Sequence, residues 1–236
     1  MAGVLSSENK KRGGFRYGAG RKKSKELRFD PSHARRPELS FEHPVHVILR
    51  TDWRVPRLRQ RRGYEAIRRV LLHCLGGDGF RVIHLSIQKN HIHLIVEAAD
   101  KDALRRGMQR FAIRAARALN AAFEREGKVF PFRYTAKQIK SARYARNTIS
   151  YVLNNWRRHR EDFYENDADT LFDAFSSASS FTGWTGDYQR KAARHKPPPD
   201  RDFEPLPVSA PRTRLLKGAW EWHGLIDPFE MPGPLT

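Results

Sequence analysis

Apolar positions recur with a regular spacing only between about residue 43 and residue 160. Strands are expected where β-branched residues alternate with others, and helices where apolar residues recur every three or four positions. The expected elements are strand 44–50, helix 58–75, strands 80–88 and 91–98, helix 102–126, strand 132–140 and helix 142–160. This β-α-β-β-α-β order, followed by one added helix, predicts an α+β fold: a ferredoxin-like sandwich with an antiparallel sheet.

Local signals for turns and helix ends support this order. Lys89-Asn90 leaves room only for a tight turn, so the second and third strands should pair antiparallel. Asp100 or Asp102 can cap the start of the long central helix, and Gly127 should end it.

The third strand carries two histidines within an apolar run, in the sequence KNHIHLIVE at 89–97. Because side chains alternate between faces, His91, His93, Ile95 and Glu97 should share one face, and Ile92, Leu94 and Val96 the other. We expect the helices to cover the second face and to leave the histidine face free. Two imidazoles two residues apart, about 7 Å at Cα, can converge on one divalent cation. Taken alone, however, the pattern favours ordinary strand histidines bonded to water or backbone. Glu97 on the same face is at most a weak candidate base.

The last helix of this region has a polar stripe beside its apolar face. At about 100° per residue, Tyr144, Thr148, Tyr151 and Asn155 fall on one side. A separate apolar face holds Ala145, Ile149, Val152, Leu153 and Trp156. Tyr151 therefore stands one turn from Asn155 on the same side. Alone, it could be a boundary residue at the edge of the core.

Together, these two motifs resemble the single-tyrosine HUH transposases, an insertion-sequence transposase-like superfamily, and more closely their REP-associated tyrosine transposase branch. The first motif reads Asn90-His91-Ile92-His93-Leu94, and the second reads Tyr151-Val152-Leu153-Asn154-Asn155. The resemblance covers about residues 43 to 160. One departure is that Asn155 is followed by Trp156, where members of the branch often have Asn-Pro.

The resemblance implies a metal-dependent DNA transposase that cleaves and rejoins single-stranded DNA. It implies that His91, His93 and Asn155 hold Mg²⁺ or Mn²⁺, and that the hydroxyl of Tyr151 attacks the scissile phosphate. The products would be a 5′-phosphotyrosine link and a free 3′-OH. The expected partner is single-stranded DNA with hairpin or palindromic repeats, bound by a monomer or a homodimer.

Two other readings stay open at this point. A replication initiator or relaxase shares the paired histidines. A non-catalytic nucleic-acid-binding protein, such as a degenerate transposase or repressor, would keep the fold without the chemistry. An RNA-recognition module is disfavoured because the aromatic-rich motif of those modules is absent from the sequence.

The charge balance independently favours a polyanionic partner. The chain of 236 residues has 45 Lys and Arg against 26 Asp and Glu, a formal net charge of +19. Two groups of basic residues are candidate DNA contacts: Arg21, Lys22 and Lys23 in a basic arm over residues 1–40, and Arg106, Arg110, Arg114 and Arg117 on one side of the long helix.

Other features of the sequence lead to expectations about the cellular location of the protein and about the segments outside the catalytic domain. A single cysteine excludes an intrachain disulfide, and neither a signal-peptide core nor an 18-residue apolar run is present, so a cytoplasmic, nucleoid-associated bacterial protein is expected. We predict a catalytic domain over residues 41–160. Residues 161–236 form an acidic and then Pro- and Ser-rich extension with a short helix at 212–227, to which the sequence assigns no function.

Overall fold

The computed structural model describes residues 38–77, 79–161, 171–186 and 204–233. All of them belong to one compact unit, Pro31–Thr236. Its elements are β1 (Val45–Arg50), α1 (Arg61–Leu72), β2 (Phe80–Ile87), β3 (His91–Ala98), α2 (Lys101–Ala122), β4 (Thr135–Gln138), α3 (Ala142–Leu153), α4 (Asn155–Arg158), η1 (Ser177–Ser180), α7 (Arg214–Lys217) and η2 (Ala219–His223). The basic arm, with Arg21, Lys22 and Lys23, lies outside the described residues.

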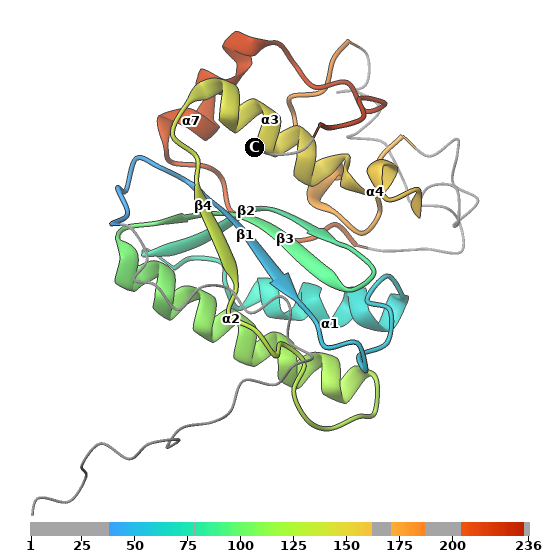
Figure 1. Cartoon of the computed structure of the whole chain (residues 1–236). Coiled ribbons are helices and arrows are strands. Elements are labelled where there is room, and N and C mark those ends of the chain that lie inside the picture. Colours follow the sequence, from blue (N-terminus) through green and yellow to red (C-terminus); the bar gives the residue numbers. More distant parts are fainter. Residues whose placement is uncertain (1–37, 78, 162–170, 187–203, 234–236) are drawn as a thin grey trace, which may run out of the picture. The chain divides into compact units, whose positions relative to one another are not determined.

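The four strands form one antiparallel sheet in the order β2-β3-β1-β4 (Figure 1). This arrangement confirms the predicted α+β sandwich. The carboxylate of Asp100 caps α2 by accepting a hydrogen bond from the backbone N–H of Ala103 at 2.6 Å. The helix ends at Ala122 rather than at Gly127, where the sequence predicts its end, and Glu124 takes a left-handed conformation (φ 51°) shortly after it.

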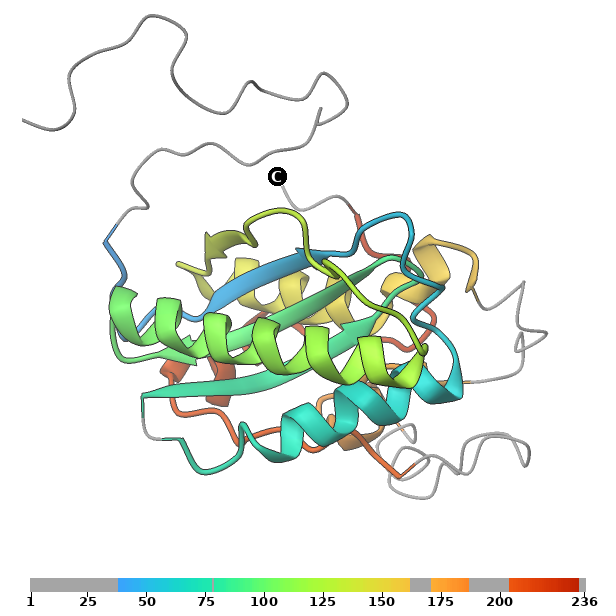
Figure 2. The ribbon, with the colours of Figure 1, turned by 90° about the horizontal axis from the view of Figure 1, so that it is seen from below.

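One face of the sheet packs on α1 and α2, as predicted. Figure 2 shows these two helices side by side over the sheet, with α3 on its far side. Ile92, Leu94 and Val96 are fully buried in this cluster together with Phe111 and Leu119 of α2. Alternation along β3 therefore divides its side chains between the two faces as the sequence indicated.

The prediction that the histidine face is left free is wrong. A second apolar cluster covers that face, joining Ile95 of β3 to Ile149 and Val152 of α3. The cluster is completed from the C-terminal part of the chain by Phe172, Phe181, Trp184, Leu216, Trp220 and Ile226. The histidines consequently lie at the edge of a filled layer rather than on an open sheet.

The last helix of the predicted pattern is interrupted. Ser141 caps α3 through its side chain, and the helix stops at Leu153 instead of continuing to residue 160. Asn154 leaves helical geometry (φ −101°, ψ 9°), and a short second helix, α4, begins at Asn155. The break has a cause outside the helix. The side-chain amide of Asn154 donates to the backbone oxygens of Asp227 and Glu230, at 2.9 and 3.1 Å.

These contacts belong to a segment that we call the C-terminal strap, residues 225–232, which lies along α3 and α4. Glu230 accepts hydrogen bonds from Arg146 and, at 2.8 Å, from Ser150. Arg157 and Arg158 donate to the backbone oxygens of Pro228 and Pro232. The single helix predicted at 212–227 is instead two short pieces, α7 and η2, separated at Gly218.

Candidate active site

The paired histidines of β3 lie side by side on the face covered by α3. Their ring centroids are 4.7 Å apart, and in the register of the sheet His91 stands opposite Arg50 of β1. A third imidazole joins them. His46 of β1 places its Nε2 3.0 Å from the Nδ1 of His93, and the two rings stack at a centroid distance of 5.2 Å.

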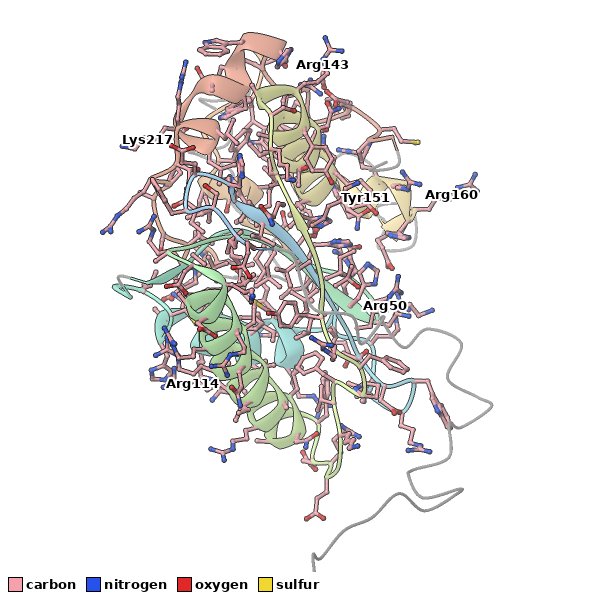
Figure 3. The ribbon with its side chains drawn as sticks, turned by 60° about the vertical axis from the view of Figure 1, so that its left-hand side comes forward. Arg50, Arg114, Arg143, Tyr151, Arg160 and Lys217 are labelled. Carbon is pink, nitrogen blue, oxygen red and sulfur yellow. The ribbon has the colours of Figure 1, made fainter. Side chains whose placement is uncertain are left out.

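Helix α3 brings Tyr151 to these rings. The centroid of its ring is 5.4 Å from that of His93 and 5.9 Å from that of His46, both edge to face. The guanidinium carbon of Arg158 lies 5.6 Å from the centre of the same ring. In Figure 3, Tyr151 and Arg50 lie on the same side of the molecule. The structure therefore brings together three of the predicted site residues, His91, His93 and Tyr151.

Asn155, the fourth predicted residue, is fully buried at the start of α4. Neither its amide oxygen nor its amide nitrogen has a hydrogen-bond partner among the described residues, and the same is true of the Nε2 of His93. The end of helix α4 lies near the histidines, since the ring centroid of His159, the residue after the helix, is 5.6 Å from that of His91. Buried polar atoms are nearly always paired, so the free atoms of Asn155 and His93 are candidates to bind a ligand.

Burial keeps the site imidazoles uncharged. It lowers the pKa of His91 to about 3, an effect that Arg50 and His159 reinforce through their charges. It lowers the pKa of His46 to about 4 and holds the pKa of His93 well below its ordinary value. At neutral pH each ring therefore offers a lone pair, which is the form that binds metal ions.

The hydrogen bonds fix which ring nitrogen of His91 carries the hydrogen. Its Nδ1 lies 2.8 Å from the side-chain oxygen of Asn90. Because an amide oxygen can only accept, the Nδ1 of His91 must be the donor, and the lone pair lies on Nε2. His46 can orient His93 in the same way. Partners of this kind hold metal-binding imidazoles in position.

The donor set fits a divalent metal. Within the described parts of the chain, no three His, Cys, Asp or Glu side chains form a group that could hold a metal ion. The two histidines of the motif therefore need a third donor of another type, and the orphaned amide oxygen of Asn155 is one. Nitrogen ligands suit Mn²⁺ more than Mg²⁺, whereas the amide oxygen suits both.

Sequence reasoning missed His46, Arg50 and the role of Asn90. Alternation along β1 could have put His46 and Arg50 on one face, opposite the buried Val45, Val47 and Leu49. The pattern could not show which strand β1 neighbours, and that neighbour decides whether they reach the histidines. Asn90 was part of the quoted motif, but its contact with His91 depends on the turn geometry.

Glu97 is not part of the site. It lies near the other end of β3, where its carboxylate accepts hydrogen bonds from the backbone and hydroxyl of Thr213, each at 2.8 Å, from the backbone of Arg212, and from Arg81. Burial alone would raise the pKa of Glu97, but these hydrogen bonds bring it below its ordinary value. Glu97 therefore holds the C-terminal part of the chain and is not a candidate base.

The arginines of the long helix also lie away from the histidines. Arg106, Arg110, Arg114 and Arg117 are exposed on α2, which covers the opposite face of the sheet. Figure 3 places Arg114 far from Tyr151. They are therefore not part of the histidine site.

Acid should unfold this protein through its buried histidines. The pKa values of His46 and His84 are both lowered by burial to about 4, so the unfolded state binds more protons than the folded state between pH 4 and 6.5. Stability is therefore complete above about pH 7 and falls as the pH drops, by about 2 kcal/mol for each imidazole between pH 7 and 5. Urea unfolding at the two pH values measures this loss. His46→Gln should reduce the loss of unfolding free energy between pH 7 and 5 by the part due to His46. His73→Gln, at an exposed histidine, should leave that loss unchanged. Equal stability at both pH values would contradict the prediction.

Comparison with known proteins agrees with the sequence motifs. Residues 40–155 match the family model described as transposase IS200 like, so this chain carries a domain of the IS200-like transposase family. A search of curated proteins gave no match. Among solved structures, a REP-associated tyrosine transposase bound to a REP hairpin is similar with a TM-score of 0.48 and 15% identity, over 77% of this chain and 97% of that one. A Deinococcus radiodurans R1 protein described as a transposase is similar with a TM-score of 0.36 and 14% identity, over 59% of this chain and 98% of that one.

No helix within the described residues is long and apolar enough to span a membrane.

Proposed function

We propose that this protein is a DNA strand transferase that uses Tyr151 as its nucleophile and belongs to the REP-associated tyrosine branch of its family. The observation that carries the proposal is the approach of Tyr151 to His93 of the same chain, with ring centroids 5.4 Å apart. The chemistry predicted from the motifs needs a tyrosine near uncharged imidazoles and an additional donor. Burial keeps His91 and His93 uncharged, and the buried amide of Asn155, four residues after Tyr151, has no hydrogen-bond partner among the described residues.

The residues of the site divide into three roles. His91, His93 and Asn155 would hold Mg²⁺ or Mn²⁺, which when bound neutralises the charge of the scissile phosphate. Tyr151 supplies the attacking hydroxyl. Arg50, whose charge acts on His91, and Arg158, beside the ring of Tyr151, would add positive charge for the phosphate.

The covalent step exchanges one phosphodiester bond for another. The Tyr151 oxygen forms a bond to phosphorus and its hydroxyl loses a proton, while the bond from phosphorus to the 3′ oxygen breaks and that oxygen gains a proton. The strand on the 5′ side leaves with a 3′-OH, and the other strand stays on the protein as a 5′-phosphotyrosine. The same 3′-OH, or another, can reverse the attack and rejoin DNA without ATP.

The DNA substrate is proposed from the sequence resemblance and the +19 charge. Single-stranded DNA with a hairpin is the expected form, and the REP hairpin in the similar structure is the first to try.

End-labelled oligonucleotides test the function. Hairpin-bearing single strands are incubated with the full chain and Mg²⁺ or Mn²⁺, and the products are separated in SDS. A 3′ label should remain on the protein, and a 5′ label should appear on a shorter strand that ends in a 3′-OH. EDTA should abolish both products. Binding without an adduct under any metal would contradict the proposal and favour a non-catalytic DNA-binding protein.

A further inference from the structure

A cavity of about 700 Å³ lies at the end of the sheet opposite the histidines, between the segment before β1, the end of β3 and the start of α7. A second hollow of about 390 Å³ adjoins it and shares Arg81 and Arg212 with it. Glu97 and Ala98, at the far end of β3 from His91, line the larger one. At about 3.4 Å per residue, the two ends of that strand are roughly 20 Å apart.

The lining of the two hollows is strongly basic. It contains five cations, Arg81, Lys140, Arg212, Arg214 and Lys217, and we call this surface the basic trough. All but Arg81 are solvent-exposed. Of the described residues, two carboxylates line the same hollows, Glu42 and Glu97, and Glu97 is already bonded to Arg81 and Thr213. The net charge of the trough is therefore positive, and it attracts an anion.

Two aromatic side chains stand at the basic trough although water surrounds most of their surface. Phe41 lines the larger cavity and is 68% exposed. Trp222 is 70% exposed, and the guanidinium carbon of Arg214 lies 5.2 Å from the centre of its ring. Cations that follow a strand, together with exposed aromatic rings on which bases stack, are the combination that binds single-stranded nucleic acid.

We infer that the basic trough is a second DNA-binding site, which holds the single strand that flanks the reacting phosphate. The inference rests on the proposed function, because it assumes that DNA is the ligand of the histidine site. The trough is also distinct from the α2 arginines: Figure 3 shows Lys217 and Arg114 on separate parts of the surface.

Matched charge reversals test the inference. The double variant Lys140→Glu and Lys217→Glu changes the trough, and Arg110→Glu with Arg114→Glu makes the same change in charge on α2. Binding of a labelled single strand that extends at least ten nucleotides beyond the hairpin is followed by fluorescence anisotropy over a range of salt. The trough variant should bind at least tenfold more weakly, and the slope of log K against log salt should fall by about 1.4, the value for two single-strand phosphates. The α2 variant should change both quantities much less.

A second variant tests the stacking. Trp222→Ala should weaken binding of the same strand roughly tenfold without altering the salt slope, because stacking releases no counterions. Thermal unfolding of each variant verifies that the fold is intact.

The outcomes separate the two proposals. Equal losses in the trough and α2 variants would show a general effect of charge and overturn the inference. If the wild-type chain forms the covalent adduct and the trough variant binds as tightly as wild type, the inference fails and the proposed function stands. If the wild-type chain neither binds DNA nor forms an adduct, both fail.

Discussion

Replacing Tyr151 with Phe should abolish the covalent protein–DNA adduct, lowering its rate of formation by about three orders of magnitude or more, while DNA affinity changes little. The substitution removes only the attacking hydroxyl. The ring keeps its contacts with His93 and His46 and its position beside Arg158. Adduct formation is measured in SDS with a 3′-labelled hairpin strand, and affinity by anisotropy on the same strand.

Tyr144→Phe is the matched control for that experiment. Tyr144 lies on the same helix, its ring is 5.1 Å from the amine of Lys137, and its hydroxyl has no hydrogen-bond partner among the described residues. Its loss should leave the adduct intact. An adduct that persists in Tyr151→Phe and disappears in Tyr144→Phe would move the nucleophile two turns along α3.

Replacing Asn155 with Leu should make the protein more stable and inactive. An amide buried without partners costs about 1–3 kcal/mol, and a leucine of similar size removes that cost. We expect the free energy of unfolding to rise by about 1 kcal/mol, which for a chain of this size raises Tm by about 2–4 °C. Adding Mg²⁺ or Mn²⁺ should raise the Tm of the wild-type protein. The same metals should leave the Tm of the variant unchanged, because the variant lacks the amide oxygen. Cleavage should be lost in parallel.

The neighbouring residue provides the control. Asn154 has the same side chain, but its amide donates to two backbone oxygens of the C-terminal strap. Asn154→Leu should therefore destabilise the protein by about 1–3 kcal/mol. If Asn155→Leu destabilises the protein as much and still cuts DNA, Asn155 has a structural role and the third ligand lies elsewhere.

The sequence predicted the parts of this protein that depend on neighbours along the chain. The periodicity of each segment was enough for the order of strands and helices, and alternation was enough to place His91 and His93 on one face and Leu94 on the other. Tyr151 and Asn155 were predicted as site residues from helical spacing together with a family resemblance, and they stay candidates, although the helix is interrupted between them.

The parts that the sequence did not predict depend on contacts between distant residues. His46 reaches His93 only because β1 lies beside β3 in the sheet. Glu97 was a candidate base in the sequence, but in the structure its carboxylate accepts a hydrogen bond from Thr213, 116 positions away. The break at Asn154 is made by residues of the C-terminal strap, 73 and 76 positions further on. No local pattern encodes these pairings.

The C-terminal strap also has a consequence for the order in which this protein is made. A ribosome synthesises Tyr151 and both histidines well before it reaches Glu230, which binds Arg146 and Ser150 of the same helix. Helix α3, which carries the proposed nucleophile Tyr151, therefore gains its contacts with Glu230 only when synthesis has passed residue 230, although domains generally begin to fold from the N-terminal side. A chain that ends before residue 225 carries every residue of the proposed site but lacks the strap contacts that hold α3, so we expect the proposed DNA-cleaving centre to become ordered only when synthesis is nearly complete.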